Sequence, residues 1–144
     1  MNFGIFIENL GEEDISVPAY KAANKAKDLD KFEDVSLFYQ NVGPCEEPKT
    51  FGLFNSTDVC HFTGTLIITF LDGLRVIKNE INNRDIYFYF TLKDQKDLFG
   101  YLECLTDDSI KIFSNQEGAE YLKTKLGRED VTVCDNLEDM VEKI

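Results

Sequence analysis

The sequence predicts an α/β fold, a three-layer α/β/α domain in which helices cover both faces of a mostly parallel sheet. Short apolar runs alternate with amphipathic segments along nearly the whole chain, and no repeat or long linker divides it. Alternating strands and helices favour a parallel sheet, because each crossover returns the chain to the same edge. The 144 residues are the length of one domain, so we expect a single domain over residues 1–144.

In the first half, a helix is expected between two buried strands. Ser16 can cap this helix, which opens at Val17 and Pro18 and ends near Asp30. Four alanines recur along it at helical spacing and give a small-residue face that can pack closely on a sheet. A loop with glycine and two prolines follows at residues 41–49. The strands predicted in this half are residues 3–7, 35–40, 51–54 and 59–62.

Residues 65–82 carry two conflicting signals. The segment begins with a run rich in β-branched residues, which favours a strand. Yet Leu66, Phe70 and Leu74 recur at helical spacing, and the segment is too long for one strand. We predict one helix over residues 65–82, capped by Thr63.

The second half alternates strands and helices with clear boundary signals. Ser114 or Asn115 is placed to cap a helix over residues 116–126 that ends at Gly127, and Asn136 to cap a last helix over residues 137–144. The whole pattern is typical of a Rossmann-like domain. The other elements predicted here are a helix at 94–105 and strands at 85–90, 109–113 and 131–134.

Charge and hydropathy exclude several classes of partner. The chain has 27 acidic and 15 basic residues, a net charge of −12. Nucleic acids and anionic membranes bind basic side chains, so we expect neither as a partner. No apolar run approaches the roughly 18 residues of a membrane span, and the N-terminus has the pattern of a strand and not of a signal peptide. We therefore expect a cytoplasmic location.

The four cysteines lack the close spacing of zinc or redox motifs. Cys60, Cys104 and Cys134 lie in apolar runs and are expected to be buried, whereas Cys45 lies in a loop and is the expected exposed thiol. We predict no disulfide, no bound metal and no cofactor.

Two stretches carry a family resemblance. Residues 58–68 (DVCHFTGTLII) place a histidine before a small-residue turn and a predicted helix, and residues 110–119 place a serine between a strand and a helix. This arrangement resembles one half of a GT-B-type glycosyltransferase, and more narrowly the glycosyltransferase-like proteins of unknown function in T4-like marine bacteriophages. The resemblance covers about residues 58–144. It implies a nucleotide or sugar ligand, and the host cytoplasm as location for a phage-encoded chain.

The resemblance also limits what one chain can do. A GT-B enzyme has two such halves, and this chain has room for one and lacks the paired-glutamate donor motif of many retaining members. We therefore expect a non-catalytic binding or interaction module that forms a homodimer. One alternative is a nucleotide-sugar-dependent glycosyltransferase, or another nucleotide-binding enzyme, completed by a partner chain or a second copy. The other is an acidic protein that binds basic partners.

Candidate site residues follow from the predicted strand ends. His61, the one histidine of the sequence, is the candidate catalytic base, and a structural role is the alternative. Turns that open helices present N–H groups and hydroxyls suited to an anion, although helix capping explains the same residues. Neither G-x-G-x-x-G nor a Walker A motif is present. The candidate ligand-binding residues are Asn9, Thr63, Gly64, Thr65, Ser114 and Asn115.

Carboxylates are also expected at this edge of the sheet. Glu8, Asp58 and Asp94 would lie near Asn9 if the fold is as predicted. Their spacing follows no metal-ligand pattern, so we interpret them as loop acids and not as a metal site.

Overall fold

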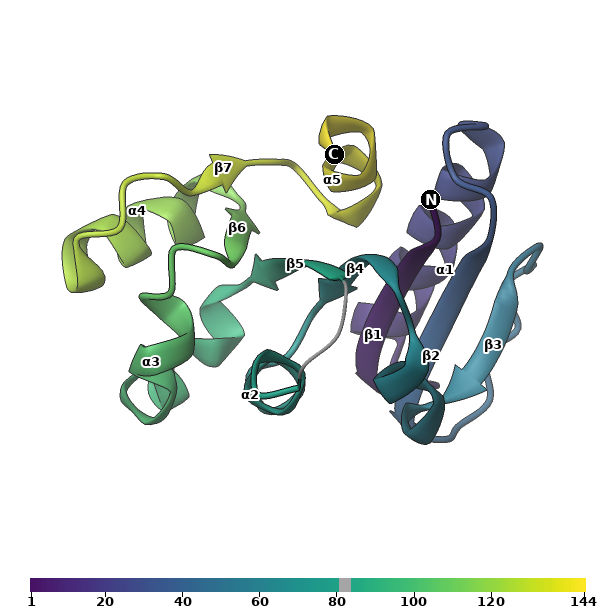
Figure 1. Ribbon diagram of the computed structural model, residues 1–144. Helices are drawn as coiled ribbons and strands as arrows, with labels where there is room; N and C mark the ends of the chain where they lie inside the picture. The colour runs from purple at the N-terminus through teal and green to yellow at the C-terminus, as the bar shows by residue number, and fades with distance from the viewer. Residues whose placement is uncertain (81–83) are drawn as a thin grey trace.

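The computed structural model describes residues 1–80 and 84–144, and it confirms the α/β class (Figure 1). Seven strands form one sheet in the order β3-β2-β1-β4-β5-β6-β7, and every neighbouring pair is parallel. This order, with the chain extending the sheet first to one side of β1 and then to the other, is the arrangement of a Rossmann-like domain.

The elements have the following bounds. The strands are β1 (Phe3–Asn9), β2 (Val35–Asn41), β3 (Gly52–Asn55), β4 (Gly64–Ile68), β5 (Arg84–Phe90), β6 (Lys111–Ser114) and β7 (Thr132–Val133). The α-helices are α1 (Glu13–Asp28), α2 (Leu71–Lys78), α3 (Leu102–Leu105), α4 (Gln116–Leu126) and α5 (Leu137–Lys143), and the 3-10 helices are η1 (Ser56–His61) and η2 (Leu92–Tyr101).

Two hydrophobic layers sandwich the sheet. Alternate residues of the central strands point to opposite faces, so Ile5 and Ile67 pack beneath α1 and α5, while Phe6 and Ile68 pack beneath α2 and α4. The four alanines of α1 are fully buried, which confirms its small-residue face. Figure 1 shows α1 and α5 on one side of the sheet and α2 and α3 on the other. Both layers together bury residues 3–7 of β1 and residues 65–68 of β4.

The single helix predicted over residues 65–82 is wrong. The segment is strand β4 followed by helix α2, and its predicted end at residue 82 lies outside the described residues. Because β4 lies between β1 and β5, it is buried on both faces and its apolar residues run consecutively. A buried strand joined closely to an amphipathic helix places apolar residues at intervals that imitate one long helix.

Three smaller predictions are also corrected. Residues 59–62, predicted as a strand, belong to η1 and the residue after it. The predicted helix at 94–105 is η2 followed by the single turn of α3. Helix α1 begins at Glu13, so Ser16 lies inside its first turn, where its hydroxyl accepts the Gly11 N–H at 2.8 Å and donates to the Asn9 carbonyl at 3.2 Å.

None of the four cysteines, all of them among the described residues, forms a disulfide, and the exposed thiol is not the predicted one. Cys104 and Cys134 are buried as expected, but Cys45 is half-buried and Cys60 is exposed. The Cys60 thiol lies at the surface of η1 and donates to Glu80 Oε1 at 3.0 Å. Within residues 1–80 and 84–144, no helix is both long and apolar enough to cross a bilayer.

Candidate functional site

The strand order reverses between β1 and β4. From β1 the chain adds β2 and β3 on one side, then returns to add β4 to β7 on the other. The helix after β1 covers one face of the sheet and the helix after β4 covers the opposite face. Diverging connections of this kind leave a crevice at the carboxyl ends of the two strands, where open α/β sheets bind ligands.

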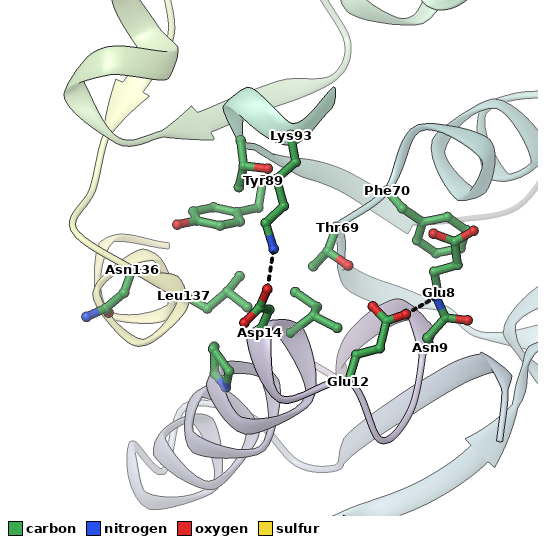
Figure 2. A pocket seen from close by; sticks show the side chains of 13 residues that line it. Glu8, Asn9, Glu12, Asp14, Thr69, Phe70, Tyr89, Lys93, Asn136 and Leu137 are labelled. Carbon is green, nitrogen blue, oxygen red and sulfur yellow. Dashed lines mark hydrogen bonds and ion pairs between the residues drawn. The ribbon is translucent and has the colours of Figure 1, made fainter. Parts of the chain in front are cut away.

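A cavity of about 340 Å³ lies at this reversal. Its walls come from the carboxyl ends of β1, β4 and β5 and from the beginnings of α1, η2 and α5 (Figure 2). We call it the switch-point crevice. The lining residues are Glu8, Asn9, Glu12, Asp14, Ile15, Pro18, Thr69, Phe70, Tyr89, Thr91, Lys93, Asn136 and Leu137.

An ion pair spans the crevice. Lys93 Nζ, at the beginning of η2, donates to Asp14 Oδ2, at the beginning of α1, over 2.8 Å. Figure 2 shows this contact between Tyr89 and Leu137 on one side and Thr69 and Glu12 on the other. The hydrogen bond and the positive charge of Lys93 lower the pKa of the Asp14 carboxyl below its ordinary value.

Carboxylates dominate the charge of the crevice. Desolvation, and then the negative charges of Asp72 and Glu12, raise the pKa of the Glu8 carboxyl above its ordinary value. Glu12 Oε1 accepts from Asn9 Nδ2 at 3.0 Å, which holds both side chains at the rim. Burial raises the pKa of the Tyr89 phenol, so this hydroxyl stays protonated and can donate at neutral pH.

One predicted ligand residue, Asn9, lines the crevice, and Glu8 lies beside it as expected. The Asn9 side chain also accepts from Asn41 Nδ2 at 2.7 Å, so it joins the ends of β1 and β2. Of the other expected acids, Asp58 lies in η1 and lines a different hollow, and the side chain of Asp94 is outside those described.

His61, Thr63, Gly64 and Thr65 lie at the opposite edge of the sheet. They end η1 and begin β4, next to Asn2, which precedes β1. The prediction that His61 lies at the carboxyl end of a strand is therefore wrong, because residues 56–61 form η1 and β4 begins after them. Thr65 is buried, and its hydroxyl contacts the Met1 sulfur at 2.9 Å. His61 and Thr63 precede β4, and Gly64 and Thr65 begin it. All four therefore lie near the amino end of β4 and do not line the switch-point crevice.

Ser114 and Asn115 lie at the correct edge but not in the crevice. Ser114 ends β6 and Asn115 follows it, and β5 separates β6 from β4. The Ser114 hydroxyl is fully buried and donates to the Phe90 carbonyl at 2.8 Å, while Asn115 Oδ1 caps α4 by accepting the Gly118 N–H at 2.8 Å. Both side chains are thus used in joining β5, β6 and α4.

This close packing predicts that Gly118→Ala destabilises the protein by about 1–2 kcal/mol, although alanine favours helices. A Cβ on Gly118 would lie 1.9 Å from Ser114 Oγ, and that hydroxyl is held by its bond to β5. Urea denaturation gives the change in unfolding free energy. Gly100→Ala is the control, because nothing lies within 4 Å of its Cβ position, and it should be near neutral. Equal effects of the two variants would contradict this account.

Most residues of the crevice are not among the site residues predicted from the sequence. Thr69, Tyr89 and Lys93 are absent from that prediction, and Thr69 lies near the beginning of the helix predicted over residues 65–82. The available signal was position: polar residues that directly follow, or end, an apolar strand in a parallel sheet share one edge. For Thr69 this signal could be used only after β4 was recognised as a strand.

Among the described residues, no group of three or more His, Cys, Asp or Glu side chains is arranged to hold a metal ion. Comparison with models of protein families, with curated proteins and with solved structures finds no match to this chain. The resemblance to glycosyltransferase halves therefore stays a prediction.

Proposed function

We propose that this protein is a binding module that holds a small polyhydroxylated molecule of the sugar class in the switch-point crevice. One observation carries the proposal: a single cavity at the carboxyl ends of β1, β4 and β5 combines hydrogen-bonding side chains with apolar surface. Its volume of about 340 Å³ suits a small ligand.

The lining groups match the chemistry of sugar hydroxyls. The carboxylates of Glu8 and Glu12 are acceptors only, and the Tyr89 hydroxyl both donates and accepts. The Asn136 amide oxygen accepts the Asp139 N–H, and its Nδ2 is left to donate. Sugar hydroxyls both donate and accept, so each can be satisfied. Apolar side chains in the same walls, such as Phe70, offer surface to the carbon-bound hydrogens of a sugar ring.

The charge of the crevice works against a phosphate-bearing ligand. A pyrophosphate would lie near the carboxylates of Glu8 and Glu12, with Lys93 already paired to Asp14. The negative charges of the pyrophosphate and of these carboxylates would repel each other. The turn after β1 also has no glycine-rich phosphate loop. The experiment must therefore distinguish a sugar-binding module from the alternative, a nucleotide-sugar-dependent transferase.

The test follows backbone amide NMR signals while glucose, galactose, N-acetylglucosamine or UDP-glucose is added. We expect at least one free sugar to shift the signals of Thr69 and Thr91 with a dissociation constant of about 1 mM, and UDP-glucose to bind no tighter. Glu8→Ala should weaken sugar binding about tenfold. Glu46→Ala makes the same charge change on an exposed loop residue and should leave binding unchanged.

Three outcomes would overturn the proposal. Binding of UDP-glucose alone would favour the nucleotide-using enzyme instead. No shift near the crevice with any of the four ligands would remove the sugar-binding role altogether. Equal weakening by Glu8→Ala and Glu46→Ala would place the binding outside the crevice and so contradict the assignment of the site.

A further inference from the structure

We infer that the switch-point crevice prefers sugars that carry an amino group, and that Lys93 occupies the amine position in the free protein. The inference rests on the proposed function and names the ligand class of the same site. In the structure an ammonium group already lies in the crevice: Lys93 Nζ is 2.8 Å from Asp14 Oδ2. A ligand amine would take this place, and Lys93 would swing into solvent.

The local charge favours such an exchange. Glu8, Glu12 and Asp14 bring three carboxylates to the lining, and Lys93 is the basic side chain among the lining residues. Asp72, which also acts on Glu8, is already paired with Arg75 at 3.1 Å. When Lys93 leaves, the crevice holds three carboxylates, and an incoming ammonium restores the charge balance that Lys93 provided.

The exchange is also inexpensive. The side chains of Lys93 and Asp14 are 71% and 77% exposed, and ion pairs that are this exposed contribute little to stability. The lysine stem is long and flexible, so its ammonium regains hydration on release. The ring hydroxyls of an amino sugar can also donate hydrogen bonds to Glu8 and Glu12. Because these contacts already position the ligand, its amine would lose less freedom on binding Asp14 than the lysine side chain does.

The experiment compares two sugars that differ in one group, glucose and glucosamine, by NMR titration at about pH 6.5, where a primary amine of this kind is mostly protonated. We expect the wild-type protein to bind glucosamine about tenfold tighter than glucose. Lys93→Gln should raise the affinity for glucosamine about fivefold above that of the wild-type protein. It should change the affinity for glucose less than twofold, because only the amine competes with Lys93.

Two further variants complete the design. Asp14→Asn should abolish the preference for glucosamine, since it removes the carboxylate that would pair with the ligand amine. Lys123→Gln removes the same charge from an exposed position on α4 and should leave the ratio of the two affinities unchanged.

The outcomes separate this inference from the proposal beneath it. Equal affinity for glucose and glucosamine, in the wild type and in Lys93→Gln, would overturn the amine preference and leave a sugar-binding crevice. Weaker glucosamine binding by Lys93→Gln would also overturn it, because Lys93 would then contact the ligand instead of competing with it. Binding of neither sugar would remove both.

Discussion

Replacing Gly64 with alanine is expected to destabilise the protein by about 3 kcal/mol, which lowers the melting temperature by roughly 10 °C in a chain of this size. Gly64 begins β4 with φ of 128°, a conformation that side chains rarely adopt. A Cβ there would lie 2.4 Å from the backbone oxygen of Asn2. That oxygen cannot move away, because it accepts the Thr65 N–H at 2.9 Å and so pairs β1 with β4.

Gly127→Ala is the matched control for this variant. Gly127 also has a positive φ, 68°, but nothing lies within 4 Å of its Cβ position. It should cost about 1 kcal/mol, so the difference between the two variants measures the contact with Asn2. If the two variants lose equal stability in thermal denaturation, the contact has no effect. Folded Gly64→Ala protein should bind sugar with unchanged affinity, because Gly64 lies far from the crevice.

Replacing Arg128 with alanine is expected to cost about 4 kcal/mol of unfolding free energy. The Arg128 side chain is 6% exposed. Its guanidinium donates to the carbonyls of Leu105 at 2.8 Å, Asp107 at 3.0 Å and Ile110. These three hydrogen bonds hold the turn between α3 and β6. Without the guanidinium, the Leu105 and Ile110 carbonyls each lose a buried hydrogen bond, while the Asp107 carbonyl keeps the Ile110 N–H as a donor. An unsatisfied buried acceptor is expensive.

Two companions make the Arg128 prediction specific. Lys125→Ala removes the same charge from an exposed position near the end of α4 and should change stability by less than about 0.5 kcal/mol. Arg128→Lys should recover only part of the loss, because an ammonium cannot reproduce the planar fork of donors. A urea midpoint for Arg128→Ala close to that of Lys125→Ala would show that the turn does not depend on the guanidinium.

Local signals predicted a large part of this fold. Helix α4 has the predicted bounds, with Asn115 capping its beginning and Gly127 in a left-handed conformation after its end. Asn136 caps α5 in the same way. Such signals are reliable because a cap and the N–H that it binds lie within one turn of helix, so the neighbouring sequence contains both partners. The alternation of strands and helices predicted the parallel sheet for a related reason.

The candidate site was harder to predict because its parts are distant in sequence. Asn9 and Glu8 were placed at the correct edge, since they end the first strand. His61 and Thr63 were placed at that edge only because residues 65–82 were predicted as a helix, which made η1 look like the end of a strand. Once β4 follows them, the same residues lie at the opposite edge.

The sequence by itself determined the class of fold, the small-residue face of α1, the bounds of α4 and the beginning of α5, all of which follow from patterns among near neighbours. Only the tertiary structure decided that β4 is a central strand and that Glu8, Thr69, Tyr89 and Lys93 surround one cavity. The physical reason is that burial on both faces of a sheet removes the alternation by which an exposed strand is recognised. A crevice between diverging connections exists only after distant strands have paired.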